Sequence, residues 1–243
     1  MQLKTRAIVL RTVKYGDSQW IVDLLTEEAG RMSCICTIPH SGRGKIKKQF
    51  FQPLHLLDLV VTCRSTASLQ RLADVRLQVP LVSIPVEPSK LTIALFVAEF
   101  LCYATRGERQ NGALYDYVSN SILWLDGASQ GYSNFHLVFM MRLSRFLGFW
   151  PNLDNYAEGK GFDLREGMFV DSVPLHKEYV KADEAARIVP LMRMNYATMH
   201  LYRMNRKDRN RCVEWLLHFY RLHIPDFPEL RSWSVLRELY ASN

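Results

Sequence analysis

Hydrophobic and polar residues alternate in short runs through the first 80 positions of the chain. Alternation with a period of two is typical of half-buried β-strands. It predicts five strands, at residues 5–15, 20–26, 32–38, 54–63 and 68–79. Turn signals at residues 15–18 and 27–30 predict tight hairpins between the first three strands. The third and fourth strands are joined by a longer connection, in which residues 47–52 are expected to form a short helix.

Three of these strands carry a hydrophobic face that we expect to line a common core. The expected core residues are Met32, Cys34, Cys36 and Ile38 on the third strand, Leu57, Leu59 and Val61 on the fourth, and Ala73, Val75, Leu77 and Val79 on the fifth. Five short strands with one long connection predict a small closed barrel of the oligonucleotide-binding type, the OB-fold.

The hydrophobic period becomes helical after the prolines at positions 80, 85 and 88. Helices are predicted at residues 90–106, 114–125, 135–149, 183–193, 208–222 and 233–240, the last with Ser232 as its N-cap. The glycine-containing stretch at residues 151–174 predicts a small irregular insert with two short extended runs. We therefore expect an α+β protein, with a barrel domain at residues 1–80 and a mostly helical domain at residues 81–243.

Charge divides the chain at the same place. Residues 1–80 hold five Lys and seven Arg against four Asp and two Glu, whereas residues 81–243 hold 19 basic and 18 acidic side chains. A basic small domain beside a near-neutral one favours a polyanion as partner of the first, most often nucleic acid. No apolar run approaches the length of a membrane span, the first residues lack a secretory signal, and the five cysteines are irregularly spaced. These features predict a cytoplasmic protein with reduced thiols.

Catalytic motifs are not evident in the sequence. The loop at residues 41–45 resembles a phosphate-cradling loop only in part, because Pro39 and Ile46 stand where that motif needs a glycine and a hydroxyl. Cys34 and Cys36 share one strand face, a spacing better suited to core thiols than to zinc. We therefore predict a protein that is not an enzyme and has no metal or cofactor.

Binding residues are easier to nominate. The predicted DNA-binding set consists of basic residues at strand ends or in loops and two aromatic residues that can stack on bases: Lys14, Arg31, Arg43, Lys45, Lys47, Lys48, Phe50 and Phe51. Trp20 suits either the barrel core or a stacking face. Charge and stacking without base readout predict weak sequence preference.

A second basic cluster lies at the start of the predicted helix 208–222. It comprises Arg203, Arg206, Lys207 and Arg211, with Trp215 one turn further on. It is either a solvated helix face or a site for an acidic peptide with a hydrophobic end.

Two stretches of the sequence resemble the RecO family of bacterial recombination mediators. Thr5–Arg11, Tyr15–Asp17, Ile21–Thr26 and Gly30–Ser33 resemble the family's N-terminus, and Arg142–Leu153 resembles its helix-end motif. The resemblance implies a non-catalytic DNA repair protein, cytoplasmic and associated with the nucleoid, that binds single- and double-stranded DNA and anneals complementary strands. It also implies contact with the acidic C-terminal tail of single-stranded DNA-binding protein, and loading of RecA together with RecR.

The insert departs from that family's pattern. Many members carry a four-cysteine zinc site there, whereas Tyr156, Gly159, Asp171 and Pro174 stand near the corresponding positions in this chain. We therefore expect a zinc-finger-like insert that folds without zinc. Two other functions stay open: an RNA-associated OB-fold module, or a protein–protein adaptor whose basic loop contacts acidic partners.

Overall fold

The computed structural model describes residues 1–38 and 46–238 and divides into two compact units. Among the described residues, the first unit comprises Met1–Gly127 and residues 230–238, and the second comprises Ala128–Glu229. None of the helices in the described ranges combines the length and hydropathy needed to cross a membrane.

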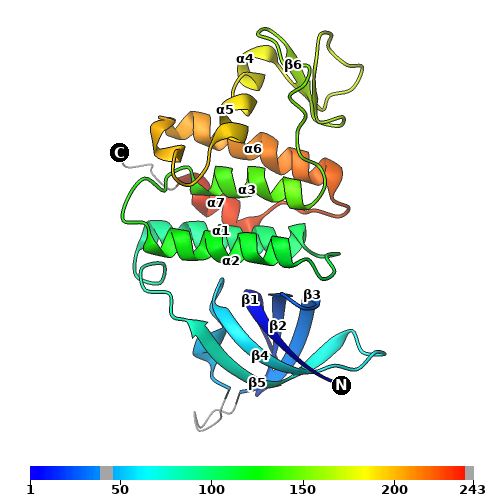
Figure 1. The fold of residues 1–243 in the computed structure, drawn as a ribbon, viewed down its shortest axis with the longest axis vertical. Helices are drawn as coiled ribbons and strands as arrows, with labels where there is room; N and C mark the ends of the chain where they lie inside the picture. The colour runs from blue at the N-terminus through cyan, green and yellow to red at the C-terminus, as the bar shows by residue number, and fades with distance from the viewer. Residues whose placement is uncertain (39–45, 239–243) are drawn as a thin grey trace. The chain divides into compact units, whose positions relative to one another are not determined.

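A closed five-stranded barrel forms the N-terminal part of the first unit (Figure 1). Its strands are β1 (Gln2–Tyr15), β2 (Gln19–Thr26), β3 (Gly30–Thr37), β4 (Leu56–Thr62) and β5 (Leu69–Val79). They close in the order β1-β2-β3-β5-β4, and a short 3-10 helix, η1 (Lys48–Phe51), lies in the connection between β3 and β4. The predicted OB-fold barrel is confirmed, including the short helix.

The barrel core contains most of the residues that alternation selected. Cys34, Leu57 and Val61 are fully buried, and Cys36 and Leu59 nearly so. The prediction for Ala73 is wrong, because this residue is exposed and Leu72 is buried in its place. The pairing of β4 with β5 shifts register between Val60 and Val61, and this bulge displaces Ala73 from the inward-facing series.

Strand β1 is buried on both faces. Ala7 and Val9 lie in the barrel core, and Ile8 and Leu10 on the opposite face are also buried. Helix α1 (Pro88–Ala104) packs against β1, which explains why alternation in this strand is hydrophobic on both sides.

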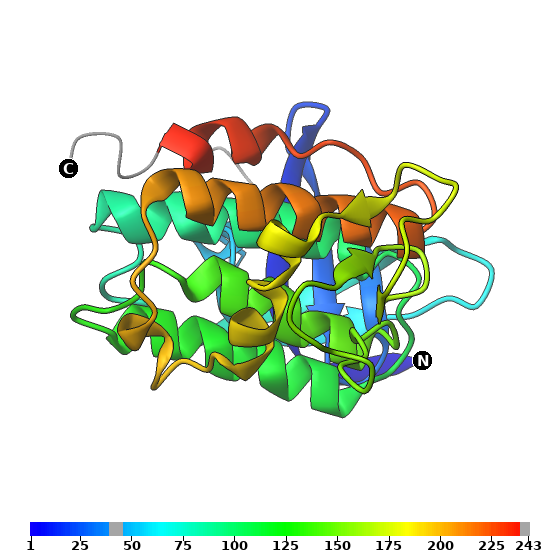
Figure 2. The same cartoon turned by 90° about the horizontal axis from the view of Figure 1, so that it is seen from above.

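Two more helices belong to the first unit, α2 (Gly112–Gly127) and α7 (Arg231–Glu238). Helix α7, red in Figure 2, packs on α1, with the rings of Phe96 and Trp233 6.3 Å apart. Ser232 does not cap it. Instead, the carboxylate of Glu99 accepts hydrogen bonds from the backbone N–H groups of Arg231 (3.1 Å) and Ser232 (2.7 Å) at the helix start. A carboxylate satisfies these groups and also favours the positive end of the helix dipole.

The second unit contains α3 (Phe135–Phe146), α4 (Ala182–Ala185), α5 (Ile188–Arg193), a 3-10 turn η2 (Met199–Leu201) and α6 (Arg206–His223). The single helix expected at residues 183–193 is split in two. Pro190 has no N–H to donate to the carbonyl of Ala186, so the helix breaks between α4 and α5.

The insert forms a three-stranded sheet in the order β7-β6-β8. Its strands are β6 (Gly161–Asp163), β7 (Met168–Val170) and β8 (Tyr179–Val180). The first two match the predicted extended runs, and the third extends the sheet past residue 174. Figure 2 shows these strands in yellow-green.

Candidate nucleic-acid interface

One end of the barrel carries an aromatic ring covered by a cation. The Nζ atom of Lys48 lies 5.1 Å from the centroid of the Trp20 ring, close enough for a cation–π interaction. Trp20 pairs across the sheet with Cys36 on one side and Lys14 on the other, and it packs partly against the barrel core. Trp20 is therefore a partly buried residue that packs against the core and keeps part of its ring exposed. Lys14, Lys47 and Lys48 are exposed.

A hollow of about 730 Å³ opens between β3 and β5. The two strands are joined by only three parallel pairs, Ser33–Ile35 with Leu69–Arg71, so they diverge beyond Ile35. The lining residues are Gln19, Ile35, Cys36, Thr37, Ile46, Thr62, Arg64, Arg71, Leu72 and Ala73. Apolar and hydroxyl-bearing side chains line the hollow together with two arginines. This combination suits a polyanion that also carries aromatic bases.

Arg64 and Arg71 are the functional candidates that our sequence analysis missed. Both are exposed, and within residues 1–38 and 46–238 neither side chain forms an ion pair. Arg64 lies in the β4–β5 connection and Arg71 on the polar side of β5. Their sequence signal is weak because each is a lone arginine outside the basic loop. Only the closure of the barrel brings them to the same hollow as β3.

Two predicted stacking residues lie deeper than expected. Phe51 is 3% exposed and belongs to the barrel core, so its predicted role as a stacking face is inconsistent with its burial. Phe50 is partly buried against the same core. A buried ring on η1 anchors the β3–β4 connection to the barrel and leaves Lys47 and Lys48 outside. Arg43 and Lys45 fall outside the described residues.

Arg31 is also not on the open surface. Its side chain is 11% exposed, and its Nη2 atom lies 3.4 Å from Oδ2 of Asp23. The preceding Gly30 has φ +68°, and a Cβ atom there would lie 2.3 Å from the backbone oxygen of Arg109. Only glycine permits this turn and the close approach to residues 108–109, which fixes the position of Arg31.

Asp23 is the ionic centre of this region. Burial by itself would raise the pKa of Asp23, but a hydrogen bond from Ser33 and the charges of Arg31 and Arg11 outweigh it and hold that pKa below its ordinary value. The Ser33 hydroxyl donates to Oδ1 at 2.6 Å, and Nε of Arg11 lies 3.0 Å from Oδ2. Asp23 is therefore ionised at neutral pH.

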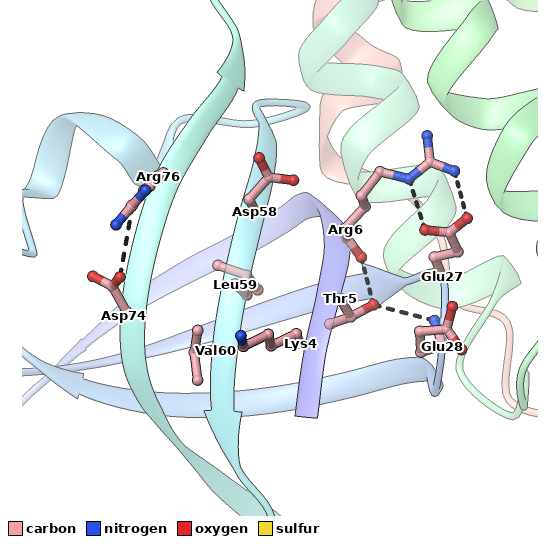
Figure 3. Close-up of a pocket in the computed structure, with 10 residues that line it drawn as sticks. All are labelled: Lys4, Thr5, Arg6, Glu27, Glu28, Asp58, Leu59, Val60, Asp74 and Arg76. Atoms are coloured by element: carbon pink, nitrogen blue, oxygen red, sulfur yellow. Dashed lines mark hydrogen bonds and ion pairs between the residues drawn. The ribbon is translucent and has the colours of Figure 1, made fainter. Parts of the chain in front are cut away.

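On a second face of the barrel, acidic side chains offset the basic ones. The pocket in Figure 3, about 580 Å³, is lined by Lys4, Thr5, Arg6, Glu27, Glu28, Asp58, Leu59, Val60, Asp74 and Arg76. Arg6 forms a two-pronged ion pair with Glu27, and this hydrogen bonding lowers the pKa of Glu27. Nε of Arg76 lies 3.8 Å from Asp74. Acids outnumber bases around this pocket, which makes it a poor site for phosphate.

The two cysteines on β3, Cys34 and Cys36, are free thiols in the barrel core. Burial raises the pKa of Cys34 to about 12 and that of Cys36 to about 11, so both stay protonated. Over the described ranges, no group of three His, Cys, Asp or Glu side chains is placed to hold a metal ion.

One arginine of the basic cluster in the second unit is held in local ion pairs. Arg211 pairs with Glu184 at 2.9 Å and with Glu214 at 3.4 Å. Trp215 is 5% exposed, so it cannot offer the peptide-binding face proposed from the sequence. Arg203 and Lys207 are exposed, whereas Arg206 is half-buried.

Aromatic packing holds the insert where the resembled family places cysteines. The ring of Tyr156 meets that of Phe169 at 4.9 Å, and Phe169 meets Phe162 at 5.1 Å. Phe162 in turn contacts Phe219 of α6 at 6.4 Å. Asp163 accepts a hydrogen bond from the backbone N–H of Arg165 at 2.8 Å, which closes the β6–β7 turn.

Comparison with known proteins relates both parts of the chain to one protein family. Residues 1–79 match the family model described as "Recombination protein O N terminal", and residues 86–233 match "Recombination protein O C terminal". The chain is 48% identical over 241 residues to the DNA repair protein RecO of Bacteroides fragilis, covering 99% of this chain and 100% of the relative. It is 46% identical to the protein of the same name from Phocaeicola vulgatus, with the same coverage.

Proposed function

The chain belongs to the RecO family of recombination proteins, and from this premise we propose that it acts in DNA repair and recombination by binding DNA on its barrel. Curated relatives that align over their full length carry the name DNA repair protein RecO. The family is one of mediators, so the activity we propose consists of binding and strand pairing, with no covalent step.

The observation that carries the proposal is a set of exposed cations on the barrel, two of which, Arg64 and Arg71, line the hollow between β3 and β5. Lys14, Lys47, Lys48, Arg64 and Arg71 are exposed, and none forms an ion pair within the described part of the chain. Cations without a carboxylate partner are available to neutralise phosphates, and each phosphate contact contributes to affinity by releasing counterions. The Trp20 ring beside Lys48 adds a surface on which a base can stack.

This arrangement suits the annealing of complementary strands. Contacts to the sugar–phosphate backbone leave the hydrogen-bonding edges of the bases free, and they lower the repulsion between two strands. Sequence preference is expected to be weak for the same reason. Double-stranded DNA presents the same phosphates and is expected to bind as well.

A strand-annealing assay tests the proposal. We expect the variant with Arg43, Lys45, Lys47 and Lys48 changed to Ala to bind single-stranded DNA weakly and to anneal slowly. The matched control removes the same number of positive charges outside the barrel, at Arg193, Arg203, Lys207 and Arg221. Unchanged DNA binding in the first variant would remove the β3–β4 connection from the mechanism, and preference for RNA over DNA would favour an RNA-associated function.

We also propose the partners that the family implies. With RecR, the protein would help to load RecA on single-stranded DNA coated with single-stranded DNA-binding protein, in the cytoplasm at the nucleoid. The acidic tail of that protein would meet the helical domain at Arg203 and Lys207, the exposed cations of the cluster. Buried Trp215 is not part of this site.

A peptide with an acidic stretch and a C-terminal Phe tests the tail site. Fluorescence anisotropy should show binding to the wild-type chain and weaker binding to a variant with Arg203 and Lys207 changed to Ala. If the variant with four barrel substitutions loses the peptide instead, the site lies on the barrel.

A further inference from the structure

A second hollow, of about 440 Å³, lies at the opposite end of the short pairing between β3 and β5. Its walls come from β1, β2, β3, the start of β5 and the C-terminal end of α1. The lining residues are Arg11, Asp23, Arg31, Met32, Ser33, Ser68, Gln70, Cys102, Tyr103 and Arg106. Most of this lining is polar, in contrast to the apolar floor of the first hollow.

The charges of this pocket do not cancel. Its charged lining residues are three arginines and one aspartate. Arg11 and Arg31 both lie against Asp23, at 3.0 Å and 3.4 Å, so one carboxylate faces two guanidinium groups. Arg106 adds a third positive charge at the rim. A pocket with this excess attracts an anion.

One N–H donor of Arg31 has no hydrogen-bond acceptor in the described part of the protein. Its Nε atom is buried and has no hydrogen-bond partner among the described residues, although its other nitrogens contact Asp23, the sulfur of Cys102 (3.4 Å) and the carbonyl of Met32 (3.2 Å). An unsatisfied buried N–H is unfavourable and rare in native proteins. Because this atom is buried, the guanidinium would have to turn toward the pocket for an anion there to accept from it.

The pocket is also held in place before any ligand arrives. The backbone N–H of Arg31 donates to the carbonyl of Glu108 at 2.9 Å, and Gly30 allows this close approach. Arg106 lies over the ring of Tyr103, with its Cζ atom 5.2 Å from the ring centroid. Arginines fixed in this way lose little conformational entropy when they bind, which favours recognition of a planar or tetrahedral oxyanion.

We propose that this pocket binds a phosphate group of a nucleic-acid strand. The proposal rests on the DNA-binding function of the barrel and adds a specific phosphate site to it. Residues 62–71 border both hollows, with Arg64 and Arg71 at the first and Ser68 and Gln70 at the second. Ser33 and Cys36, which line the two hollows from β3, are about 10 Å apart along the strand. One single strand can therefore reach both.

Salt titrations of single-stranded oligonucleotide binding test this site in the full-length chain. We expect Arg11→Ala and Arg106→Ala each to weaken binding and to reduce the slope of log affinity against log salt by about 0.7, the value for one lost phosphate contact on a single strand. The control is Arg76→Ala, an exposed arginine on β5 that lines the charge-matched pocket and should leave the slope unchanged.

The outcomes separate this inference from the function that it rests on. If both pocket variants keep the wild-type slope while Arg64→Ala and Arg71→Ala lower it, the phosphate site is wrong and DNA binding by the barrel stands. If none of the four changes the slope, and the variant with Arg43, Lys45, Lys47 and Lys48 changed to Ala does not change it either, the barrel function fails as well. Oligonucleotides with and without a 5′-phosphate distinguish a terminal phosphate from an internal phosphodiester as the occupant.

Inorganic phosphate gives a readout that is independent of DNA. The Nε–H resonance of Arg31 should shift saturably as phosphate is added to the wild-type protein, and the shift should weaken in Arg106→Ala. A resonance that does not move with phosphate, while DNA still binds, would overturn the proposal.

Discussion

The barrel and the helical second unit both carry many arginines, but they use them differently. On the barrel, Lys14, Lys47, Arg64 and Arg71 are exposed without ion pairs in the described ranges. In the second unit, Arg187 pairs with Asp208, and Arg211 with Glu184. A count of positive charge would credit both regions with polyanion binding. The barrel also has ion-paired arginines, such as Arg11 with Asp23, so what distinguishes the hollow is that the arginines lining it, Arg64 and Arg71, have no carboxylate partner in the described ranges.

The interiors differ in a related way. The first unit buries an ionic group, Asp23 with Arg31, beside the barrel. The second unit buries aromatic rings, such as Phe162 and Phe169, and a guanidinium, Arg209, whose Nε donates to the side-chain oxygen of Asn134 and whose charge helps to keep His136 neutral.

Removal of the buried carboxylate should have the largest effect. Asp23→Ala leaves the guanidinium of Arg31 buried without its counter-charge and should lower the free energy of unfolding by about 3–5 kcal/mol. Glu184→Ala, which breaks the half-exposed pair with Arg211 in the second unit, should cost less than about 1 kcal/mol. Urea unfolding of both variants measures the difference. Equal losses would mean that the two kinds of ion pair are equivalent.

Substitution of two glycines with positive φ distinguishes the cost of a steric clash from the cost of backbone strain. Gly30 has φ +68° and the backbone of residues 108–109 against it, whereas Gly159 has φ +87° and open space around its Cα. Gly159→Ala should cost about 1–2 kcal/mol, the strain of a left-handed conformation. Gly30→Ala should cost clearly more, because its Cβ would also clash. Thermal unfolding of the pair decides, and equal costs would show that the contact at Gly30 can relax.

Acid should destabilise the second unit more than the barrel. Complete burial and the charge of Arg209 lower the pKa of His136 from 6.5 to about 3. A depressed histidine contributes stability above its ordinary pKa and loses it as pH falls below that value, because only the unfolded chain takes up the proton. In the barrel, burial also lowers the pKa of His55, but by less than at His136, and the lowered pKa of Asp23 acts only once the pH falls below its ordinary value of 3.8.

Hydrogen exchange, corrected for the intrinsic rates, measures this difference by segment. Between pH 6.5 and pH 3.8, opening free energies around α3 should fall while those around Asp23 hold. His136→Leu should flatten the profile of the second unit. A barrel that loosens first on acidification would reverse the comparison.

Metal removal should have the smallest effect. The insert is held by contacts among Tyr156, Phe162 and Phe169, so a chelator should leave the melting temperature unchanged. Metal analysis of the purified protein is expected to find no stoichiometric zinc. Zinc at one equivalent would contradict this account of the insert.

The sequence was sufficient to predict the barrel because alternation in β3 and β4 reports directly which side chains face the core. It failed at Ala73, because a bulge changes the period without changing composition. It also failed at Phe51 and Trp215, since an aromatic residue beside basic residues looks the same in sequence whether its ring is open or buried. Arg64 and Arg71 were missed because their shared hollow exists only after β3 and β5 pair.

The central claim is that cations without ion pairs on the barrel, rather than the total charge of the chain, bind DNA. The most direct measurement is the salt dependence of single-strand affinity for two variants of the full-length chain. Changing Lys48, Arg64 and Arg71 to Ala should reduce the slope of log affinity against log salt by about 2, whereas changing Arg203 and Lys207 should leave it unchanged. A reduced slope in the second variant with a wild-type slope in the first would contradict the account.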